Sequence, residues 1–150
     1  MYERFSERAR KVLLLANQEA QRFNHECIGT EYLLLAILKA GGGAINILKH
    51  QNIDPEKVRA EVYKSIQPGQ AMVTMGRRPH TPRVKRAITW AENEATDLGC
   101  NFVGTEHLLL GILHEGDGMA AKVLDRLGLK MDPALEDARN PCGGQEGTLL

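Results

Sequence analysis

The chain has few of the residues from which common catalytic centres are built. It contains only two serines, Ser6 and Ser65, and neither stands in a GxSxG nucleophile motif. The glycine-rich stretch 143–148 lacks the lysine of a Walker A phosphate loop. The pair His114-Glu115 is not followed by a second histidine at helical spacing, which excludes a zinc-protease helix. These absences predict that the chain is not an enzyme by itself and has no catalytic residues.

An excess of one charge and a long apolar run are also missing. The formal net charge is zero, with 19 basic and 19 acidic residues, which argues against bulk attraction to nucleic acid or to an anionic membrane. The longest apolar run, residues 32–38, is seven residues long, whereas a membrane-spanning helix needs about 20. The first eight residues carry acidic side chains and lack the apolar stretch of a signal peptide. We therefore expect neither nucleic acid nor a membrane among the partners.

What the chain does contain is a tandem repeat. Residues 28–31 read Ile-Gly-Thr-Glu and residues 103–106 read Val-Gly-Thr-Glu, and a leucine-rich run follows each. Aligning residues 6–43 with 81–118 at an offset of 75 gives 14 identities in 38 positions. A feature present in both copies belongs to the fold of the repeat or to a site that occurs twice.

The cysteines and histidines do not follow this repeat. Cysteines occur at positions 27, 100 and 142, form no CxxC pair, and align with other residue types in the opposite copy. None of the five histidines recurs either. We therefore predict no metal site and no cofactor, and we interpret the cysteines as free thiols in a reducing cytoplasm.

Helical periodicity dominates both copies. In the first copy, small and apolar residues from Ala9 to Phe23 recur at the spacing of one helical face, and the second copy repeats the pattern from Val84 to Leu98. The predicted helix starts share a capping side chain: Ser6, Thr30, Asp54, Thr81, Thr105 and Asp132. Third helices are expected near 44–51 and 119–127, and fourth helices near 55–64 and 133–140. No stretch alternates with period two, so the sequence predicts an all-α fold of eight helices in two four-helix repeats.

The expected domain organisation follows the repeat. Residues 1–140 form one compact domain, with repeat one at about 5–64, a linker at 65–80 rich in Gly and Pro, and repeat two at about 81–140. Residues 141–150 have the composition of a flexible tail or linker.

The doubled motif closely resembles the Clp amino-terminal repeat domain, above all the domain that opens ClpC-type AAA+ unfoldases. The resemblance rests on the two Gly-Thr-Glu elements with their leucine runs, on Phe5-Ser6-Glu7-Arg8-Ala9, and on His80-Thr81-Pro82-Arg83. It covers about residues 3–138. It implies a module that receives client and adaptor proteins and passes them to the AAA+ ring of the parent chain, and through that ring to a Clp peptidase.

The resemblance also implies a ligand. ClpC-type domains of some bacteria recognise phosphoarginine, and the acidic residues of that site fall on Glu31 and Glu106. A helix start offers free N–H groups to the phosphate, and a carboxylate can pair with the guanidinium. The hypothesised binding residues are Thr30, Glu31, Thr105, Glu106, Ser6, Arg8, Thr81 and Arg83. We expect the site at Glu106 to be the better preserved, because the first copy departs from the family pattern around Gly42.

Each interpretation has a competing one. A threonine cap contributes about 1 kcal/mol and an acid in the first turn about 0.5 kcal/mol, which would explain Thr-Glu without a ligand. The basic stretch 75–86 is either a solvated face, a docking surface for an acidic adaptor or, least favoured, a nucleic-acid site. The chain itself is either the binding module of a ClpC-like unfoldase or a free-standing accessory protein that docks onto a Clp complex.

Overall fold

The structure, a computed structural model, describes residues 2–69 and 78–139. Helices account for all the regular secondary structure in these ranges, and no strand is present there. The helices are α1 (Glu7–Arg22), α2 (Thr30–Ala40), α3 (Gly43–His50), α4 (Pro55–Ser65), α5 (Pro82–Asp97), α6 (Thr105–Glu115), α7 (Met119–Arg126) and α8 (Met131–Arg139). The prediction of an all-α fold with eight helices is confirmed. The start of the last helix was predicted wrongly, because α8 begins at Met131 and includes Pro133 in its first turn.

The two repeats are linked through the segments that precede their helices. Phe5 forms an isolated parallel bridge with Val103, and Ile28 forms one with His80. The two bridges are equivalent by the repeat, because His80 is the match of Phe5 and Val103 is the match of Ile28 at the offset of 75 residues. In each repeat, the segment before the first helix therefore pairs with the segment before the second helix of the other repeat. The repeats are interlocked rather than placed side by side.

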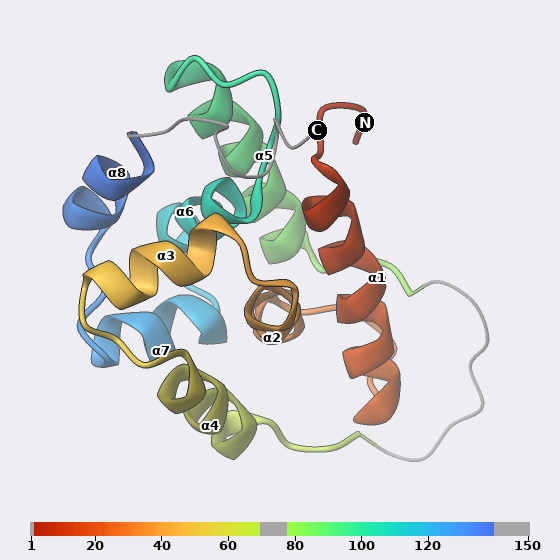
Figure 1. Ribbon diagram of the computed structural model, residues 1–150. Coiled ribbons are helices and arrows are strands. Elements are labelled where there is room, and N and C mark those ends of the chain that lie inside the picture. The colour runs from red at the N-terminus through yellow and green to blue at the C-terminus, as the bar shows by residue number, and fades with distance from the viewer. Residues whose placement is uncertain (1, 70–77, 140–150) are drawn as a thin grey trace.

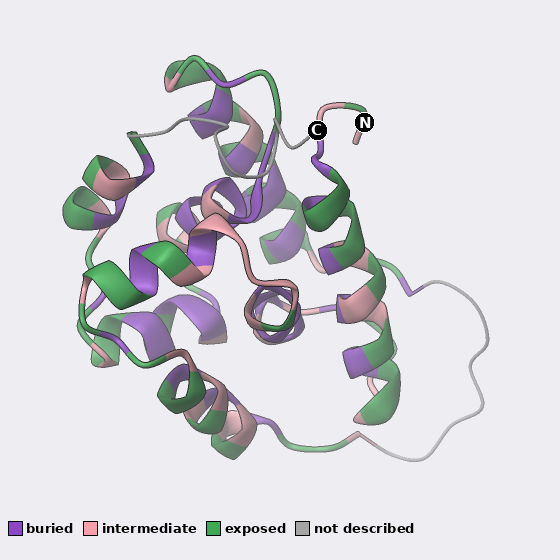
Figure 2. Ribbon diagram, viewed as in Figure 1, coloured by how far each residue is buried: buried purple, intermediate pink, exposed green. Residues whose placement is uncertain are grey.

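The core is built on the leucine-rich helices α2 and α6. Seven of the 11 residues of each helix are buried, and Figure 2 shows the colour of buried residues around much of α2. α1 packs along α2, and α5 packs along α6. Burying one leucine stabilises the fold by about 2 kcal/mol, so the two leucine triplets, 33–35 and 108–110, account for much of the core. Both triplets are core, as their all-round apolar character predicted.

The short third helices cross between the repeats. α3 packs on α6 and α8, and α7 packs on α2 and α4. In Figure 1, α2 lies end-on at the centre, with α1 and α7 on opposite sides of it. The start of each second helix therefore lies beside the start of a third helix from the other repeat, and this arrangement positions the candidate site.

Among the described residues, no single helix is long and apolar enough to cross a membrane. Only α2 and α3 taken together reach that length and composition, and they are bent by 92°. Cys27 is free and exposed. Cys100 is buried and disulfide-bonded, so the interpretation of the cysteines as free thiols is wrong for Cys100.

Candidate functional site

The threonines at the starts of α2 and α6 do not cap their own helices. The N-cap residues are Gly29 and Gly104, and Thr30 and Thr105 occupy the first helical positions. The capping role predicted for these threonines is therefore wrong. The reason is that their hydroxyl groups bind elsewhere.

Each threonine caps a helix of the other repeat. Thr105 Oγ1 accepts a hydrogen bond from the backbone N–H of Ala44 at 3.2 Å, in the first turn of α3. Thr30 Oγ1 accepts one from the N–H of Ala120 at 3.4 Å, in the first turn of α7. The starts of α3 and α7 have only glycine at the N-cap and no side-chain cap of their own. The threonine thus joins two helix starts from different repeats at each site.

This pairing brings together the positive ends of two helix dipoles. Each helix start carries roughly half a positive charge and unsatisfied N–H groups. Two such ends at one place favour an anion more strongly than either end alone. The arrangement occurs twice, at α6 with α3 and at α2 with α7.

The arginines also act across the repeats. Arg8 Nη1 donates to the carbonyl oxygen of Ala40 at 2.9 Å, at the end of α2. Glu31 lies at the other end of this helix, about 14 Å away along the axis. At the Arg8 end lies Thr105, whose Oγ1 donates to the carbonyl of Gly41 at 2.8 Å. Arg8 therefore belongs with Thr105 and Glu106 of the second repeat, not with Glu31.

The same exchange places Arg83 with the first repeat. Arg83 Nε lies 3.4 Å from Glu115 Oε2 at the end of α6. Glu115 Oε1 accepts a hydrogen bond from the N–H of Gly118 at 2.9 Å, and a Cβ built on Gly118 would lie 2.4 Å from Thr30 Oγ1. These contacts connect Arg83 to the start of α2.

The predicted residues therefore form two composite sites. The Glu106 site comprises Ser6, Arg8, Thr105, Glu106 and the loop 41–43. The Glu31 site comprises Thr30, Glu31, Thr81, Arg83 and the loop 116–118. Neither site is complete within one repeat, which the sequence did not indicate.

Ser6 and Thr81 have a structural role at these sites. Their side chains cap α1 and α5, accepting from the N–H groups of Ala9 and Val84 at 3.1 and 3.2 Å. The backbone N–H of Ser6 donates to Val103, and that of Thr81 donates to Ile28, which holds each cap beside a Gly-Thr-Glu element. Each hydroxyl accepts one hydrogen bond here and still has its own O–H to donate, so the predicted ligand role of these two residues stays a prediction.

The two glutamates differ in where their carboxylates lie. A Cβ built on Gly43 would stand 2.6 Å from Glu106 Oε1, so Glu106 covers the start of α3. A Cβ built on Gly29 would stand 2.4 Å from Glu31 Oε1, so Glu31 turns back over its own N-cap residue. Substituting either glycine would displace the acidic side chain beside it.

Sequence reasoning missed the histidine that follows Glu106. His107 is fully buried, and its Nδ1 accepts a hydrogen bond from the N–H of Gly104 at 2.9 Å. Burial, and secondarily the positive charge of Arg4, lowers the pKa of His107 to about 4. His107 is therefore neutral at pH 7. Its place in the repeat, aligned with the buried Tyr32, was the signal that could have identified it as a core residue.

The basic stretch 75–86 divides into a buried arginine and an exposed group, because Arg83, Lys85 and Arg86 are exposed on α5. Residues 75–77 lie outside the described residues. Arg78 is buried and donates through Nε to the carbonyl of His25 at 2.8 Å. Arg83 and Arg86 both lie within 4.0 Å of Glu115. Arg78 is thus engaged within the protein, whereas the side chains of Arg83 and Arg86 are 53% and 58% exposed beside Glu115, so a solvated helix face stays compatible with this part of the stretch.

Comparison with known proteins gives relatives along most of the chain. Residues 4–127 match the family described as the Clp repeat (R) N-terminal domain. The chain is 46% identical over 129 residues to the chloroplastic chaperone ClpC of Pisum sativum and 45% identical over 132 residues to a ClpA homolog, an ATP-binding subunit of the Clp protease, of Guillardia theta. These matches cover 85% and 87% of this chain but 14% and 16% of the relatives. The chain thus spans about one seventh of the length of these two relatives.

Solved structures share the fold at lower identity. The N-terminal domain of ClpD from Arabidopsis thaliana has a TM-score of 0.70 at 24% identity, covering 92% of this chain and 94% of that one. The Hsp104 N-terminal domain from Candida albicans has a TM-score of 0.78 at 15% identity, covering 97% and 95%. At these identities, the two structures support the all-α fold.

Proposed function

The chain belongs to the Clp repeat N-terminal domain family, and we propose that it is a non-catalytic module that binds client and adaptor proteins for a ClpC-like ATP-dependent unfoldase. In this proposal, ATP hydrolysis belongs to AAA+ modules that the sequence in hand does not contain. The module works in the cytoplasm and passes clients to the AAA+ ring and its peptidase. The family membership and the 46% identity to a ClpC chaperone support this role.

We further propose that the module recognises phosphoarginine on clients. The observation that carries this proposal is the pairing of helix starts, where α6 meets α3 and α2 meets α7 through a threonine. Two positive dipole ends and an arginine at the same place suit a phosphate dianion. A glutamate in the first turn of one helix supplies the carboxylate for the guanidinium of the ligand. A plain helix cap would require neither the arginine nor the second helix.

A peptide titration tests the ligand. A peptide carrying phosphoarginine should bind, while the same peptide with arginine or with phosphoserine should bind at least tenfold more weakly, because each lacks one half of the recognised group. The double variant Glu31→Ala plus Glu106→Ala should weaken phosphoarginine binding at least tenfold, measured by isothermal titration calorimetry.

The matched control is the double variant Glu56→Ala plus Asp132→Ala. Glu56 and Asp132 are also the second residues of their helices, α4 and α8, so this variant removes the same charge from equivalent helix positions. It should leave the affinity unchanged. Equal affinity for the wild type and the Glu31/Glu106 double variant would show that the assigned site is wrong.

A further inference from the structure

Trp90 is an exposed aromatic ring that the fold holds in one orientation. It is the only tryptophan of the chain, and 40% of its surface is exposed on α5. The ring stacks on that of His114, with the centroids 4.4 Å apart and the planes 9° apart. Because one face of the indole covers His114, the exposed area of Trp90 lies on its outer side.

A buried carboxylate fixes this platform from below. Glu94 Oε2 lies 2.5 Å from His114 Nε2, and the side chain of Glu94 is 10% exposed. The imidazole is thus held between a carboxylate at its Nε2 and the indole on its face. Trp90 and Glu94 belong to α5, whereas His114 comes from the last turn of α6. Trp90 therefore loses little conformational freedom when a partner binds, which favours it as a binding hot spot.

Positive charge lies beside the platform, at the start of α5. Arg83, Lys85 and Arg86 are exposed and fall within the first two turns of the helix. The first turn holds no acidic residue, whereas the matched helix α1 has Glu7 there. Cations at the positive end of a helix dipole are disfavoured, so this arrangement costs stability unless an anion offsets it.

Glu115 offsets this charge only in part. Arg83 Nε and Arg86 Nη2 lie 3.4 and 4.0 Å from the same oxygen, Glu115 Oε2. One carboxylate thus faces two guanidinium groups, and both arginine side chains remain more than half exposed. Arg86 lies one turn from Trp90 on the same side of α5, since residues at a spacing of four are neighbours on a helix. The surface therefore offers an aromatic ring beside an incompletely neutralised cation.

Repeat one has a different pair of side chains at the matched positions. Trp90 aligns with Leu15, which is half-buried and packs against the core. His114 aligns with Lys39. Because an aliphatic group and a cation supply no ring, a ligand that needs the Trp90 platform has one site per chain.

We propose that Arg86, Trp90 and His114 form a docking surface for an acidic segment of a partner protein that carries an aromatic residue. This inference rests on the proposed function as a module that binds adaptors and clients. Charge complementarity selects the occupant, because its carboxylates complete the neutralisation that Glu115 begins. Its aromatic ring packs on the outer side of the indole. None of the three residues belongs to the two composite sites.

A single-stranded nucleic acid would use the same kinds of side chain in larger number. Its binding sites combine a basic groove along the backbone with aromatic rings for successive bases. Here the platform is one indole, and the formal net charge of the chain is zero. These observations favour a protein segment, and an oligonucleotide serves as the competing probe.

Titration followed by the fluorescence of Trp90 tests the surface directly, because no other tryptophan contributes to the emission. The probe is a short peptide with one phenylalanine between glutamates, and it should shift the emission with a stoichiometry of one. Replacing its phenylalanine by alanine, or its glutamates by glutamines, should weaken binding at least tenfold. A single-stranded oligonucleotide should leave the emission unchanged.

Two variants test the two parts of the surface, with binding measured by the anisotropy of a labelled peptide. Trp90→Ala should weaken binding at least tenfold, and Arg86→Gln at least threefold. Arg86→Gln leaves the stack of Trp90 on His114 in place, so the test does not depend on how well Trp90→Ala folds. Thermal melting shows whether each variant is folded.

Matched controls remove similar groups elsewhere. Phe102→Ala deletes an aromatic ring that is 42% exposed and precedes the start of α6, whereas His114 lies near the end of that helix. Lys11→Gln removes the exposed cation of α1 that aligns with Arg86. Both controls should leave the affinity for the acidic peptide unchanged.

Several results would overturn the inference. They are a constant emission of the wild type at millimolar peptide, equal affinity for the alanine peptide, displacement of the peptide by the oligonucleotide, or full affinity in folded Arg86→Gln. If the phosphoarginine peptide still binds by calorimetry, the proposed function stands, because that titration does not depend on Trp90. Absence of binding by both peptides would count against both proposals.

Discussion

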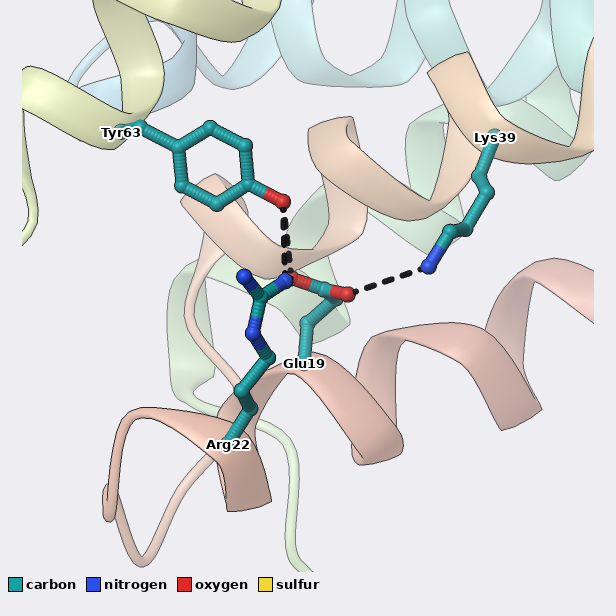
Figure 3. Close-up of polar contacts among 4 residues, drawn as sticks. All are labelled: Glu19, Arg22, Lys39 and Tyr63. Atoms are coloured by element: carbon teal, nitrogen blue, oxygen red, sulfur yellow. Dashed lines mark hydrogen bonds and ion pairs between the residues drawn. The ribbon is translucent and has the colours of Figure 1, made fainter.

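Each repeat buries one glutamate at the same position of its first helix, but the two repeats neutralise it differently. In repeat one, Glu19 lies 3.4 Å from Lys39 and 3.5 Å from Arg22 and accepts a hydrogen bond from the Tyr63 hydroxyl at 3.2 Å (Figure 3). These side chains come from α1, α2 and α4. A buried carboxylate requires such partners, because desolvating an unpaired charge is costly.

In repeat two, the matched Glu94 has a different partner. Glu94 Oε2 lies 2.5 Å from His114 Nε2, and His114 aligns with Lys39. The His114 ring stacks on Trp90 with the centroids 4.4 Å apart and the planes 9° apart. Duplication has therefore kept the requirement for a partner at this position while the partner itself has changed. Matched positions in the two repeats can be compared as natural variants of one environment.

The largest expected difference between matched positions is at Gly111 in α6. A Cβ built on Gly111 would lie 2.1 Å from the backbone oxygen of Ala87 in α5, so the two helix backbones meet there. The matched residue in α2 is the buried Ala36. Gly111→Ala should lower the free energy of unfolding by about 3 kcal/mol, because a backbone cannot rotate out of the way.

The reciprocal variant Ala36→Gly should cost only about 1 kcal/mol, since it loses helix propensity without creating a clash. Urea denaturation of both variants checks the comparison. A loss below about 1 kcal/mol for Gly111→Ala would show that α5 and α6 separate easily and that the two helix pairs are equivalent.

The second difference is between His107 and Tyr32, and it depends on pH. The folded state holds the pKa of His107 at about 4, whereas an unfolded histidine has a pKa of about 6.5. Between these values the unfolded chain binds more protons, so stability is full above pH 6.5 and falls as the pH drops toward 4. Going from pH 7 to pH 5 should cost about 2 kcal/mol through His107 alone. Burial raises the pKa of Tyr32, so the matched position stays neutral across this range.

Urea denaturation of the wild type and of His107→Gln at pH 7 and pH 5 isolates this contribution. The glutamine does not titrate, so the loss of stability on acidification should be smaller in the variant by about 2 kcal/mol. The same loss in both proteins would mean that His107 is protonated as easily in the folded state as in the unfolded chain.

Local sequence signals predicted the helices well. The caps at Ser6, Thr81 and Asp54 are where the sequence placed them, because an N-cap acts within three residues of itself. The apolar periodicity identified the core faces of α1 and α5, because it too is a pattern within one helix. The domain and linker boundaries, and the tail at 141–150, stay predictions, and much of the linker and the whole tail lie outside the described residues.

The composite nature of the sites was beyond the reach of the sequence. Thr30 caps a helix start 90 residues away, and Arg8 reaches a carbonyl 32 residues away. No spacing rule encodes such contacts. The mismatch of Ala40 with Glu115 was visible in the alignment, but the contact of Glu115 with Arg83 was not. The expectation that the Glu106 site is better preserved stays a prediction. The original reason for it no longer applies, because the loop 41–43, which departs from the family pattern, belongs to the Glu106 site.

The smallest expected difference is between the two threonines that cap across the repeats. Thr105 Oγ1 both accepts from Ala44 at 3.2 Å and donates to Gly41 at 2.8 Å, while Thr30 Oγ1 accepts from Ala120 at the longer distance of 3.4 Å. Thr105→Val keeps the shape but loses both bonds, and it should cost about 1.5 kcal/mol of the free energy of unfolding. Thr30→Val should cost about 0.7 kcal/mol.

Urea denaturation of the two single variants and the double variant measures whether the caps act independently. They stabilise different helix pairs, so their effects should add within about 0.5 kcal/mol. A larger coupling would mean that loosening α3 from α6 also loosens α7 from α2, and the interlocked repeats would then respond as one unit. Additivity would instead show that each composite site is held by its own threonine, which is the condition for the two sites to diverge in ligand binding within one fold.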